Sequence, residues 1–454
     1  MYFLKTAKIV FNKIFFYFSM NIKVRFAPSP TGHLHIGGLR AALFNFYFAK
    51  QQSGKFVIRI EDTDHERNKE EYTQAILDSF AWCGIQSDEE ILYQSKRQDV
   101  YAKYIERLLA SGKAYYTDEL DADGNLSRVI KCKVDKTRQE IAFTDIIRGT
   151  VTFPITEFED FIIVRSDGTP LYNLVVVIDD IEMQISHVIR GEEHLTNTPK
   201  QIMLYEAFGV HIPFFAHLPL ILGQDRKKLS KRDAATAVID YKNEGIFSEA
   251  LCMYLLRLGW AYKDQEIFTL DEIYRYFRLE DIHSAGAIFD NQKLLSVNRY
   301  FMKQKLVDEL YSEMITLFSA QKEFIFDEVK DKKIIELYRD RTSTLKELAL
   351  ICTKIKKRPC FEGVEPALYK EFKSVISSMV DQKESLPDMT LLVREAERIT
   401  GLTKHTVYMA LRFALFGVVE SPSILKLAAL FSPEELIARF THFLSFEDSL
   451  LRVK

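Results

Sequence analysis

Two short stretches of this chain carry residues whose types and spacing suit the handling of a polyphosphate. The first, Arg25 to Gly38 (RFAPSPTGHLHIGG), places histidines in a glycine-containing turn, and Gly37 and Gly38 would let a ligand approach the backbone closely. His35 can donate a hydrogen bond to an oxygen that becomes negatively charged in a reaction. A lone histidine is more often structural, but the flanking glycines and the helix pattern that follows favour a functional His35.

The second stretch is a basic loop, Lys227 to Arg232 (KKLSKR), which follows a buried strand pattern. A run of charges is usually only a solvated surface loop. A loop at this place could instead fold over a triphosphate held at the His35 turn. Two lysines of the loop would then offset the charge of a departing pyrophosphate.

Charged residues also stand at the predicted ends of strands. Glu61, Asp62 and Asp64 follow an apolar strand, where carboxylates commonly cap helices and turns, although one of them could bind the amino group of a ligand. Arg25 and Arg190 could each clamp a carboxylate through two hydrogen bonds. An ordinary surface ion pair is the alternative interpretation for both arginines.

The elements that would position these residues form a βαβ pattern. The spacing predicts a strand over Ile22 to Phe26, a helix over Gly38 to Gln51 and a strand over Lys55 to Ile60. Further helices are predicted over Glu70 to Cys83 and Arg97 to Leu109. This order predicts a parallel sheet with a ligand crevice at the carboxyl ends of its strands.

Short alternating runs between Lys113 and Arg190 indicate a mostly β insertion. Its predicted strands are Asp145 to Phe153, Phe161 to Arg165, Leu171 to Ile178 and His187 to Arg190. A helix is then expected from Thr198, with Pro199 at its first position and Gly209 past its end. A buried strand follows over Phe214 to Leu222, and the chain is predicted to be helical after Asp240.

The composition is that of an ordinary globular protein, with 454 residues, a net charge of −3 and 5 scattered cysteines. The cysteines form no paired motif, so a reducing compartment is expected and a zinc site is not. No segment after the first 19 residues has about 18 uninterrupted apolar residues, so no membrane helix is predicted. Residues 1 to 19 are basic and apolar. They could be a targeting segment, but we favour an upstream extension of a chain that starts at Met20.

With these residues in view, the chain resembles bacterial-type glutamyl-tRNA synthetases, which are class I aminoacyl-tRNA synthetases. The HIGH signature of that family corresponds to His35 to Gly38, and its KMSKS signature corresponds to Lys228 to Arg232. Matching motifs lie between and beyond them in the expected order: RIEDTD (59–64), RSDGTPLYNLVVVIDD (165–180), HVIRGEEHLTNTPKQ (187–201), FAHLPLIL (215–222) and ALCMYLLRLGW (250–260). The resemblance is strong from Lys23 to about Asn298 and weaker beyond.

The resemblance implies an α/β fold: a Rossmann-like class I synthetase catalytic domain with a mixed α/β insertion, followed by an all-α C-terminal anticodon-binding region. The expected domains are an N-terminal extension (1–19), the first half of the catalytic domain (20–112), an acceptor-end-binding insertion (113–195), the second half of the catalytic domain with the KLSKR loop (196–240), a helical stem-contact domain (241–305) and a helical anticodon-binding domain (306–454).

The resemblance also implies a glutamate site. Arg25 and Ser29 would help to bind glutamate, and Glu61 would receive its amino group. Tyr172 and Arg190 would complete the pocket. An acidic substrate needs cationic partners, so two arginines and one carboxylate suit an amino acid that carries a side-chain carboxylate.

ATP, brought as its Mg²⁺ complex, would lie between the two signature motifs, Pro28 to Gly38 and Lys228 to Arg232. The resemblance assigns ATP binding to His35, Gly37, Gly38 and Lys231, and catalysis to His35, Lys228 and Lys231. The implied reaction activates L-glutamate as glutamyl-adenylate and transfers it to the 3′ end of tRNA(Glu). It needs no side-chain nucleophile, because positioning and charge stabilisation suffice. A cytoplasmic monomer with no membrane partner is expected.

Departures from the family leave alternatives open. Tyr115, Tyr116 and Thr117 stand where many relatives have paired cysteines, so no zinc is implied, and Ser296 replaces a usual tryptophan. An enzyme that glutamylates tRNA(Gln) for later amidation is the main alternative. A nucleotidylyltransferase with a related HxGH motif is less favoured, because the second signature is complete and the C-terminal region is long and helical. An inactive tRNA-binding paralogue is less favoured because His35, Lys228 and Lys231 are intact. Leu411 to Gly417 resembles an anticodon-domain helix, which argues against short paralogues that lack this domain.

Overall fold

The computed structural model describes residues 21–64, 67–120, 126–229, 237–361, 366–381 and 389–446. The predicted N-terminal extension and Ser230, Lys231 and Arg232 of the basic loop therefore lie outside the described residues. The chain divides into two compact units. The first holds the residues up to Tyr241 together with Ser248–Leu294, and the second holds Lys242–Phe247 and the residues from Leu295 onwards.

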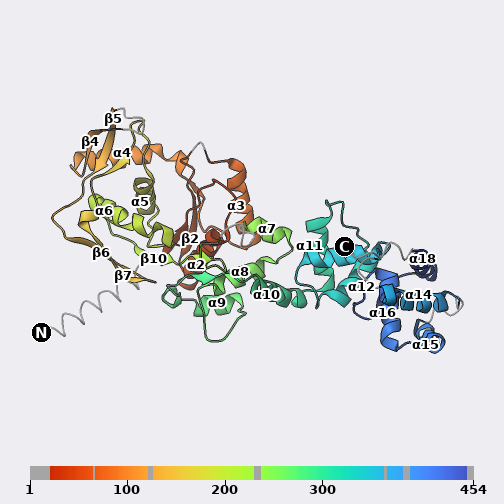
Figure 1. Cartoon of the computed structure of the whole chain (residues 1–454). Helices are drawn as coiled ribbons and strands as arrows, with labels where there is room; N and C mark the ends of the chain where they lie inside the picture. Colours follow the sequence, from red (N-terminus) through yellow and green to blue (C-terminus); the bar gives the residue numbers. More distant parts are fainter. Residues whose placement is uncertain are drawn as a thin grey trace. The chain divides into compact units, whose positions relative to one another are not determined.

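A seven-stranded sheet organises the first unit (Figure 1). Its strands lie in the order β3 (Leu92–Tyr93), β2 (Lys55–Ile60), β1 (Lys23–Phe26), β9 (His187–Gly191), β10 (Phe214–Leu218), β6 (Glu140–Asp145) and β7 (Gly149–Pro154). All neighbouring pairs run parallel except β6 and β7, which form an antiparallel hairpin at one edge. The predicted parallel sheet is confirmed, with an antiparallel hairpin at one side.

Helix α2 (Ile36–Gln51) connects β1 to β2 across one face of this sheet. Successive strand residues point to opposite faces. A Cβ atom added to Gly38 of α2 would meet Phe26 of β1, whereas Arg25 of β1 contacts α5 (Tyr172–Glu182). Helices α2 and α5 therefore cover opposite faces. Gly54 ends the crossover, and a Cβ atom there would lie 2.5 Å from the carbonyl oxygen of Ile22, so the tight return to β2 requires glycine.

Three predictions of local structure are wrong. The run Leu171 to Ile178 is not a strand but belongs to α5, because residues Leu174 to Asp180 are all buried in the helix and packing overrides the strand preference of its valines. The run Asp145 to Phe153 spans the turn of the β6–β7 hairpin, where Asp145 accepts hydrogen bonds from the following backbone. The strand predicted over Phe214 to Leu222 breaks at Pro219, which has no N–H group to donate.

The remaining elements of the first unit surround the sheet. A second, antiparallel sheet joins β4 (Ala114–Leu120), β5 (Leu126–Cys132) and β8 (Phe161–Val164). The predicted helices are confirmed as α3 (Glu70–Trp82), α4 (Gln98–Ala110) and α6 (Thr198–Phe208). Gly209 ends α6 with a positive φ of 67°, as its sequence position indicated. Strand β11 (Ile221–Leu222) pairs with β12 (Ala287–Ile288), and α8 (Ser248–Arg257) and α9 (Leu270–Tyr276) pack against α2.

The second unit is helical throughout its described part. Its helices are α11 (Val307–Phe318), α12 (Glu328–Tyr338), α13 (Leu345–Lys356), α14 (Pro366–Val380), α15 (Met389–Thr400), α16 (Lys404–Phe416), α17 (Ile424–Ala428) and α18 (Pro433–Leu444). Helices α7 (Val238–Asn243) and α10 (Asn291–Gln304) each cross the division between the units. An aromatic cluster of Phe361, Phe413 and Phe443 joins α16 and α18. Within the described ranges, no helix combines the length and the apolar character needed to cross a bilayer.

Candidate active site

The five residues predicted to bind glutamate line one pocket of 260 Å³ near the carboxyl ends of β1, β2 and β9. They are Arg25, Ser29, Glu61, Tyr172 and Arg190. We call this cavity the arginine pocket. It collects residues that are up to 165 positions apart, because β1 and β9 are neighbours in the sheet and α5 begins at the same edge. The structure thus brings the predicted residues together, while their individual roles stay predictions.

Arg25 enters the pocket as half of a buried ion pair. Its Nε donates to the Oδ1 of Asp180 at 3.0 Å, and both side chains are almost fully buried. Arg59 donates to the same Oδ1 at 2.5 Å and to the Oε1 of Glu61 at 3.2 Å. Burial alone would raise the pKa of Asp180, but the two arginines hold it below its ordinary value. For Glu61 burial wins over Arg59 and Arg25, so the pKa of this carboxyl is raised.

Arg190 is held differently, because its described side-chain partners are uncharged groups. Its Nε donates to the Nε2 of His217 at 3.1 Å, and its Nη2 donates to the Oγ1 of Thr198 at 2.8 Å and to the carbonyl of His194 at 3.3 Å. Its Nη1 is buried and has no hydrogen-bond partner among the described residues. Burial lowers the pKa of Arg190. A buried guanidinium with a spare donor suits the carboxylate of a ligand.

A second cavity of 340 Å³, the histidine pocket, adjoins the first and shares Gly37, Gly38 and Glu193 with it. His35 and Lys228 both line it. The His35 turn and the described start of the basic loop therefore face one cavity, and ATP binding there stays a prediction.

His35 is the N-cap of α2, where its Nδ1 accepts from the backbone N–H of Gly37 at 3.0 Å. Burial lowers the pKa of His35, and nearby Lys228 lowers it further, so the ring is neutral at pH 7. A neutral ring whose Nδ1 accepts carries its proton on Nε2. His35 can thus donate to a phosphate oxygen beside the free N–H groups of the helix start.

A hairpin delivers Lys228 to the histidine pocket. Gly223 donates to the carbonyl of Lys227 at 2.8 Å, and Lys228 pairs with Leu222 of β11. The chain reverses direction between them, where Arg226 has a positive φ of 61°. The basic loop is therefore anchored at its start by backbone pairing rather than being only a solvated surface run.

The three acids of RIEDTD have separate roles. Asp62 accepts from the N–H of Ser95 at 2.8 Å and from its hydroxyl at 2.6 Å, so it fixes a turn. Asp64 pairs with Arg67 on the surface. Of these acids, only Glu61 lines the arginine pocket. The turn interpretation therefore applies to Asp62, a surface ion pair accounts for Asp64, and ligand binding by Glu61 stays a prediction.

Sequence reasoning missed the residues behind the pocket. Asp180 and Arg59 hold Arg25 and Glu61, His217 holds Arg190, and His194 lines the pocket itself. Their signals were the paired acids at the end of an apolar run and the histidine of FAHL. Neither signal names a partner, since Asp180 is 155 residues from Arg25.

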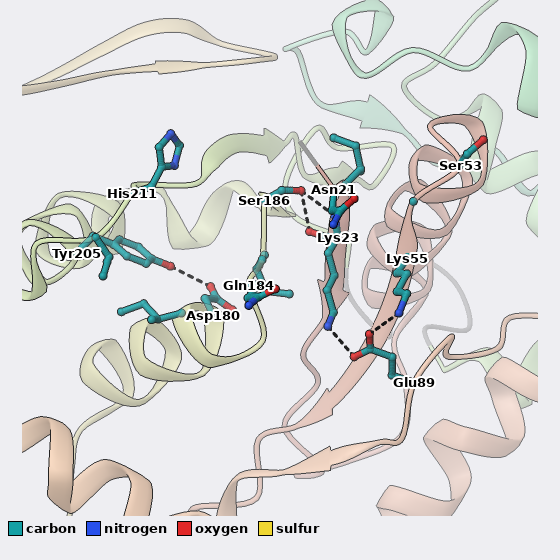
Figure 2. A pocket seen from close by; sticks show the side chains of 15 residues that line it. Asn21, Lys23, Ser53, Lys55, Glu89, Asp180, Gln184, Ser186, Tyr205 and His211 are labelled. Carbon is teal, nitrogen blue, oxygen red and sulfur yellow. Dashed lines mark hydrogen bonds and ion pairs between the residues drawn. The ribbon is translucent and has the colours of Figure 1, made fainter. Parts of the chain in front are cut away.

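A larger cavity of 610 Å³ lies at the other end of the strands, where β1 and β2 begin (Figure 2). Figure 2 shows Lys23 and Lys55, at the first positions of β1 and β2, both pointing to Glu89. None of the predicted site residues lines it. Ligands of parallel α/β sheets bind at the carboxyl ends of the strands, so the two smaller pockets are the better candidates. In the described part of the chain, no group of three His, Cys, Asp or Glu residues could hold a metal ion.

A parallel sheet that carries a glycine–histidine turn and a lysine hairpin at its carboxyl edge is the arrangement of a class I aminoacyl-tRNA synthetase. The family model of the class I tRNA synthetase (E and Q) catalytic domain matches residues 21–123 and 119–296. A model of an anticodon binding domain matches residues 309–444.

Comparison with individual proteins shows which synthetases of this class the chain is similar to. The glutamate–tRNA ligase of Nitratidesulfovibrio vulgaris (strain DP4) is 39% identical over 460 residues, which cover 92% of this chain and 98% of that protein. Glutamate–tRNA ligase 2 of a Nitratiruptor species is 40% identical over 456 residues, 92% of this chain and 97% of that protein. A crystal structure of a glutamate–tRNA ligase from Elizabethkingia meningosepticum in complex with its amino acid has a TM-score of 0.81 at 28% identity, over 94% of this chain and 99% of that one. The chain belongs to the glutamate–tRNA ligase family.

Proposed function

We propose that this chain activates L-glutamate with ATP and transfers it to the 3′ end of tRNA(Glu) for protein synthesis. The observation that carries the proposal is the arginine pocket, in which the partnerless Nη1 of Arg190 and the carboxyl of Glu61 are found together. The pocket adjoins the histidine pocket, so an amino acid and a nucleotide would lie side by side.

Glutamate carries three charged groups, and the pocket offers a partner for two of them, the side-chain carboxylate and the ammonium group, while the α-carboxylate is the group that reacts. Arg190 binds the side-chain carboxylate through its free Nη1, and Glu61 receives the ammonium group. Ser29 and Tyr172 close the pocket, while Arg25, already paired with Asp180, adds positive potential. A glutamine side chain would leave the charge of Arg190 uncompensated, which disfavours it.

ATP, with its Mg²⁺ as part of the substrate, binds in the histidine pocket. His35 donates to a phosphate oxygen, Gly37 and Gly38 admit the phosphates, and Lys228 neutralises the leaving diphosphate. Lys231, which lies outside the described residues, would add a second positive charge. An oxygen of the α-carboxylate of glutamate attacks the α-phosphorus of ATP, and the bond from that phosphorus to the diphosphate oxygen breaks. A ribose hydroxyl at the tRNA 3′ end then attacks the activated carbonyl, and AMP leaves.

The tRNA would contact both units. We assign the acceptor end to the insertion 113–195, which includes the β4–β5–β8 sheet, the stem to the helical region 241–305, and the anticodon to 306–454, within which the anticodon binding model matches. We propose 20–112 and 196–240 as the catalytic halves, although β9, Tyr172 and Arg190, which fall within the range 113–195, belong to the same sheet and pocket. We expect the enzyme to act as a monomer in the cytoplasm.

Aminoacylation with purified tRNAs tests this function. Labelled glutamate should be transferred to tRNA(Glu) in the presence of ATP, and glutamine should not be transferred. Transfer to tRNA(Gln) at a comparable rate would favour the alternative, an enzyme that serves a later amidation. Failure to charge either tRNA would contradict the proposal.

A further inference from the structure

We infer that His217, held by Asp145, is a positioning residue that fixes Arg190 and so determines the preference for a carboxylate substrate. This inference rests on the proposed role of Arg190 in glutamate binding. The contact that carries it is the 3.1 Å hydrogen bond from the Nε of Arg190 to the Nε2 of His217, with both residues buried.

The tautomer of His217 follows from its two neighbours. A guanidinium can only donate, so Nε2 of His217 must accept and carries no proton. Its Nδ1 lies 2.6 Å from the Oδ2 of Asp145, which accepts, so the proton sits on Nδ1. The imidazole is therefore neutral, and Asp145 fixes which ring nitrogen faces Arg190.

Asp145 is itself rigidly placed. It is fully buried, and its Oδ1 accepts from the N–H groups of Ile147 and Arg148 at 3.0 Å each. The backbone N–H of His217 also donates to its Oδ2, at 3.1 Å. These contacts arise because Asp145 ends β6 next to β10, the strand that carries His217. The orientation of Arg190 is thus set by the pairing of two sheet strands.

Thr198 supports the same arrangement from α6. Its Oγ1 accepts from the Nη2 of Arg190 at 2.8 Å and lies 3.1 Å from the Nε2 of His217. With Nε and Nη2 both occupied, Nη1 is the one donor nitrogen of Arg190 that lacks a partner within the described part of the chain.

The two arginines of the pocket differ in whether their positive charge is compensated within the protein. Arg25 is paired with the carboxylate of Asp180, which compensates its charge. Arg190 is held by a neutral acceptor, and the nearest carboxylate in this chain of contacts, Asp145, lies on the far side of the imidazole. Arg190 therefore keeps its positive charge available for a ligand carboxylate, whereas an amide could offer only a neutral oxygen.

Two amide variants of His217 test the contacts of its two ring nitrogens separately. In His217→Gln the terminal amide oxygen reaches the position of Nε2 and can still accept from Arg190. In His217→Asn the amide reaches only the position of Nδ1, so the contact with Asp145 persists and the one with Arg190 is lost.

The KM values for glutamate and for ATP are measured by tRNA-dependent pyrophosphate exchange. We expect His217→Asn to raise the glutamate KM about tenfold or more with an ATP KM within about threefold of the wild type, and His217→Gln to restore a glutamate KM within about threefold. In Asp145→Asn no carboxylate holds the proton on Nδ1 of His217, so this variant should raise the glutamate KM in the same way. Preference for glutamate over glutamine should fall with it.

Arg190→Ala separates this inference from the function on which it rests. Added to Arg190→Ala, His217→Asn should cause no further rise in glutamate KM, because the residue that it positions is gone. Equal effects of His217→Asn and His217→Gln, or equal shifts in both KM values, would overturn the positioning role while leaving the proposed site standing. An unchanged glutamate KM in Arg190→Ala itself would overturn the proposed site and this inference together.

Discussion

The Nε of Arg25 donates to the Oδ1 of Asp180 at 3.0 Å, and this contact joins β1 to α5 beneath the arginine pocket. The same carboxylate oxygen also takes a hydrogen bond from Arg59. One buried acid therefore compensates two buried cations, one of which lines the pocket while the other holds Glu61.

Removal of that acid should damage both stability and glutamate binding. In Asp180→Ala the buried guanidinium of Arg25 loses its carboxylate partner and that of Arg59 keeps only Glu61, so we expect the free energy of unfolding to fall by about 3 kcal/mol or more. Both tryptophans, Trp82 and Trp260, belong to the first unit, so urea unfolding followed by tryptophan fluorescence reports on it. Glu89→Gln is the control, because Glu89 is half-exposed and should cost less than about 1 kcal/mol. A loss no larger than that of the control would contradict the role of Asp180.

Glu61→Gln should weaken recognition of the substrate amino group. The amide keeps the size of the side chain but removes its negative charge, so glutamate should lose about tenfold to a hundredfold in kcat/KM. The analogue 2-hydroxyglutarate lacks the ammonium group and serves as the comparison, with its affinity measured by competition against glutamate. The wild type should prefer glutamate strongly over this analogue, and the variant should prefer it much less. An unchanged preference would show that Glu61 does not contact the amino group.

Lys228→Ala should slow adenylate formation by about a hundredfold, because a charge that stabilises the leaving diphosphate is lost. The same direction is predicted for Lys231→Ala. Affinity for tRNA, measured by filter binding, should be nearly unchanged. Lys227→Ala is a matched control, since Lys227 is exposed and does not line the histidine pocket. Equal losses in Lys227→Ala and Lys228→Ala would indicate a general charge effect instead.

Acid should destabilise the first unit through His187. Burial lowers the pKa of this histidine from 6.5 to about 4. The unfolded chain therefore binds a proton between pH 6.5 and 4 while the folded chain does not, so stability falls as the pH falls through this window, by up to about 3 kcal/mol. Urea unfolding at pH 7.5 and 4.5 should show a smaller drop in His187→Phe than in the wild type. His283→Asn, at an exposed histidine, should leave the drop unchanged, and an equal drop in all three proteins would contradict the assignment.

The sequence predicted the parts of the fold that local patterns determine. The β1–α2–β2 unit could be read from apolar spacing and from Gly54, and α6 from Pro199 and Gly209. Helix α5 could not, because its valines prefer strands and only burial against the sheet makes the run helical.

The residues of the site likewise fall into those that the sequence predicts and those that depend on the tertiary fold. Arg25, Glu61 and Arg190 could be chosen from their types, their places at strand ends and the family resemblance. The residues that hold them could not, because the contacts of Asp180 with Arg25 and of His217 with Asp145 join positions 155 and 72 residues apart. Only the order of strands in the sheet and the packing of α5 against it bring such pairs together.

The measurement that tests the central claim most directly is the pair of KM values for glutamate and ATP in Arg190→Ala, from tRNA-dependent pyrophosphate exchange. Loss of the guanidinium should raise the glutamate KM about a hundredfold and leave the ATP KM within about threefold. The reason is that Nη1 of Arg190 would bind the side-chain carboxylate of glutamate and would not contact ATP. A glutamate KM that does not change, or one that rises only as much as the ATP KM, would contradict the claim that Arg190 recognises the glutamate side chain.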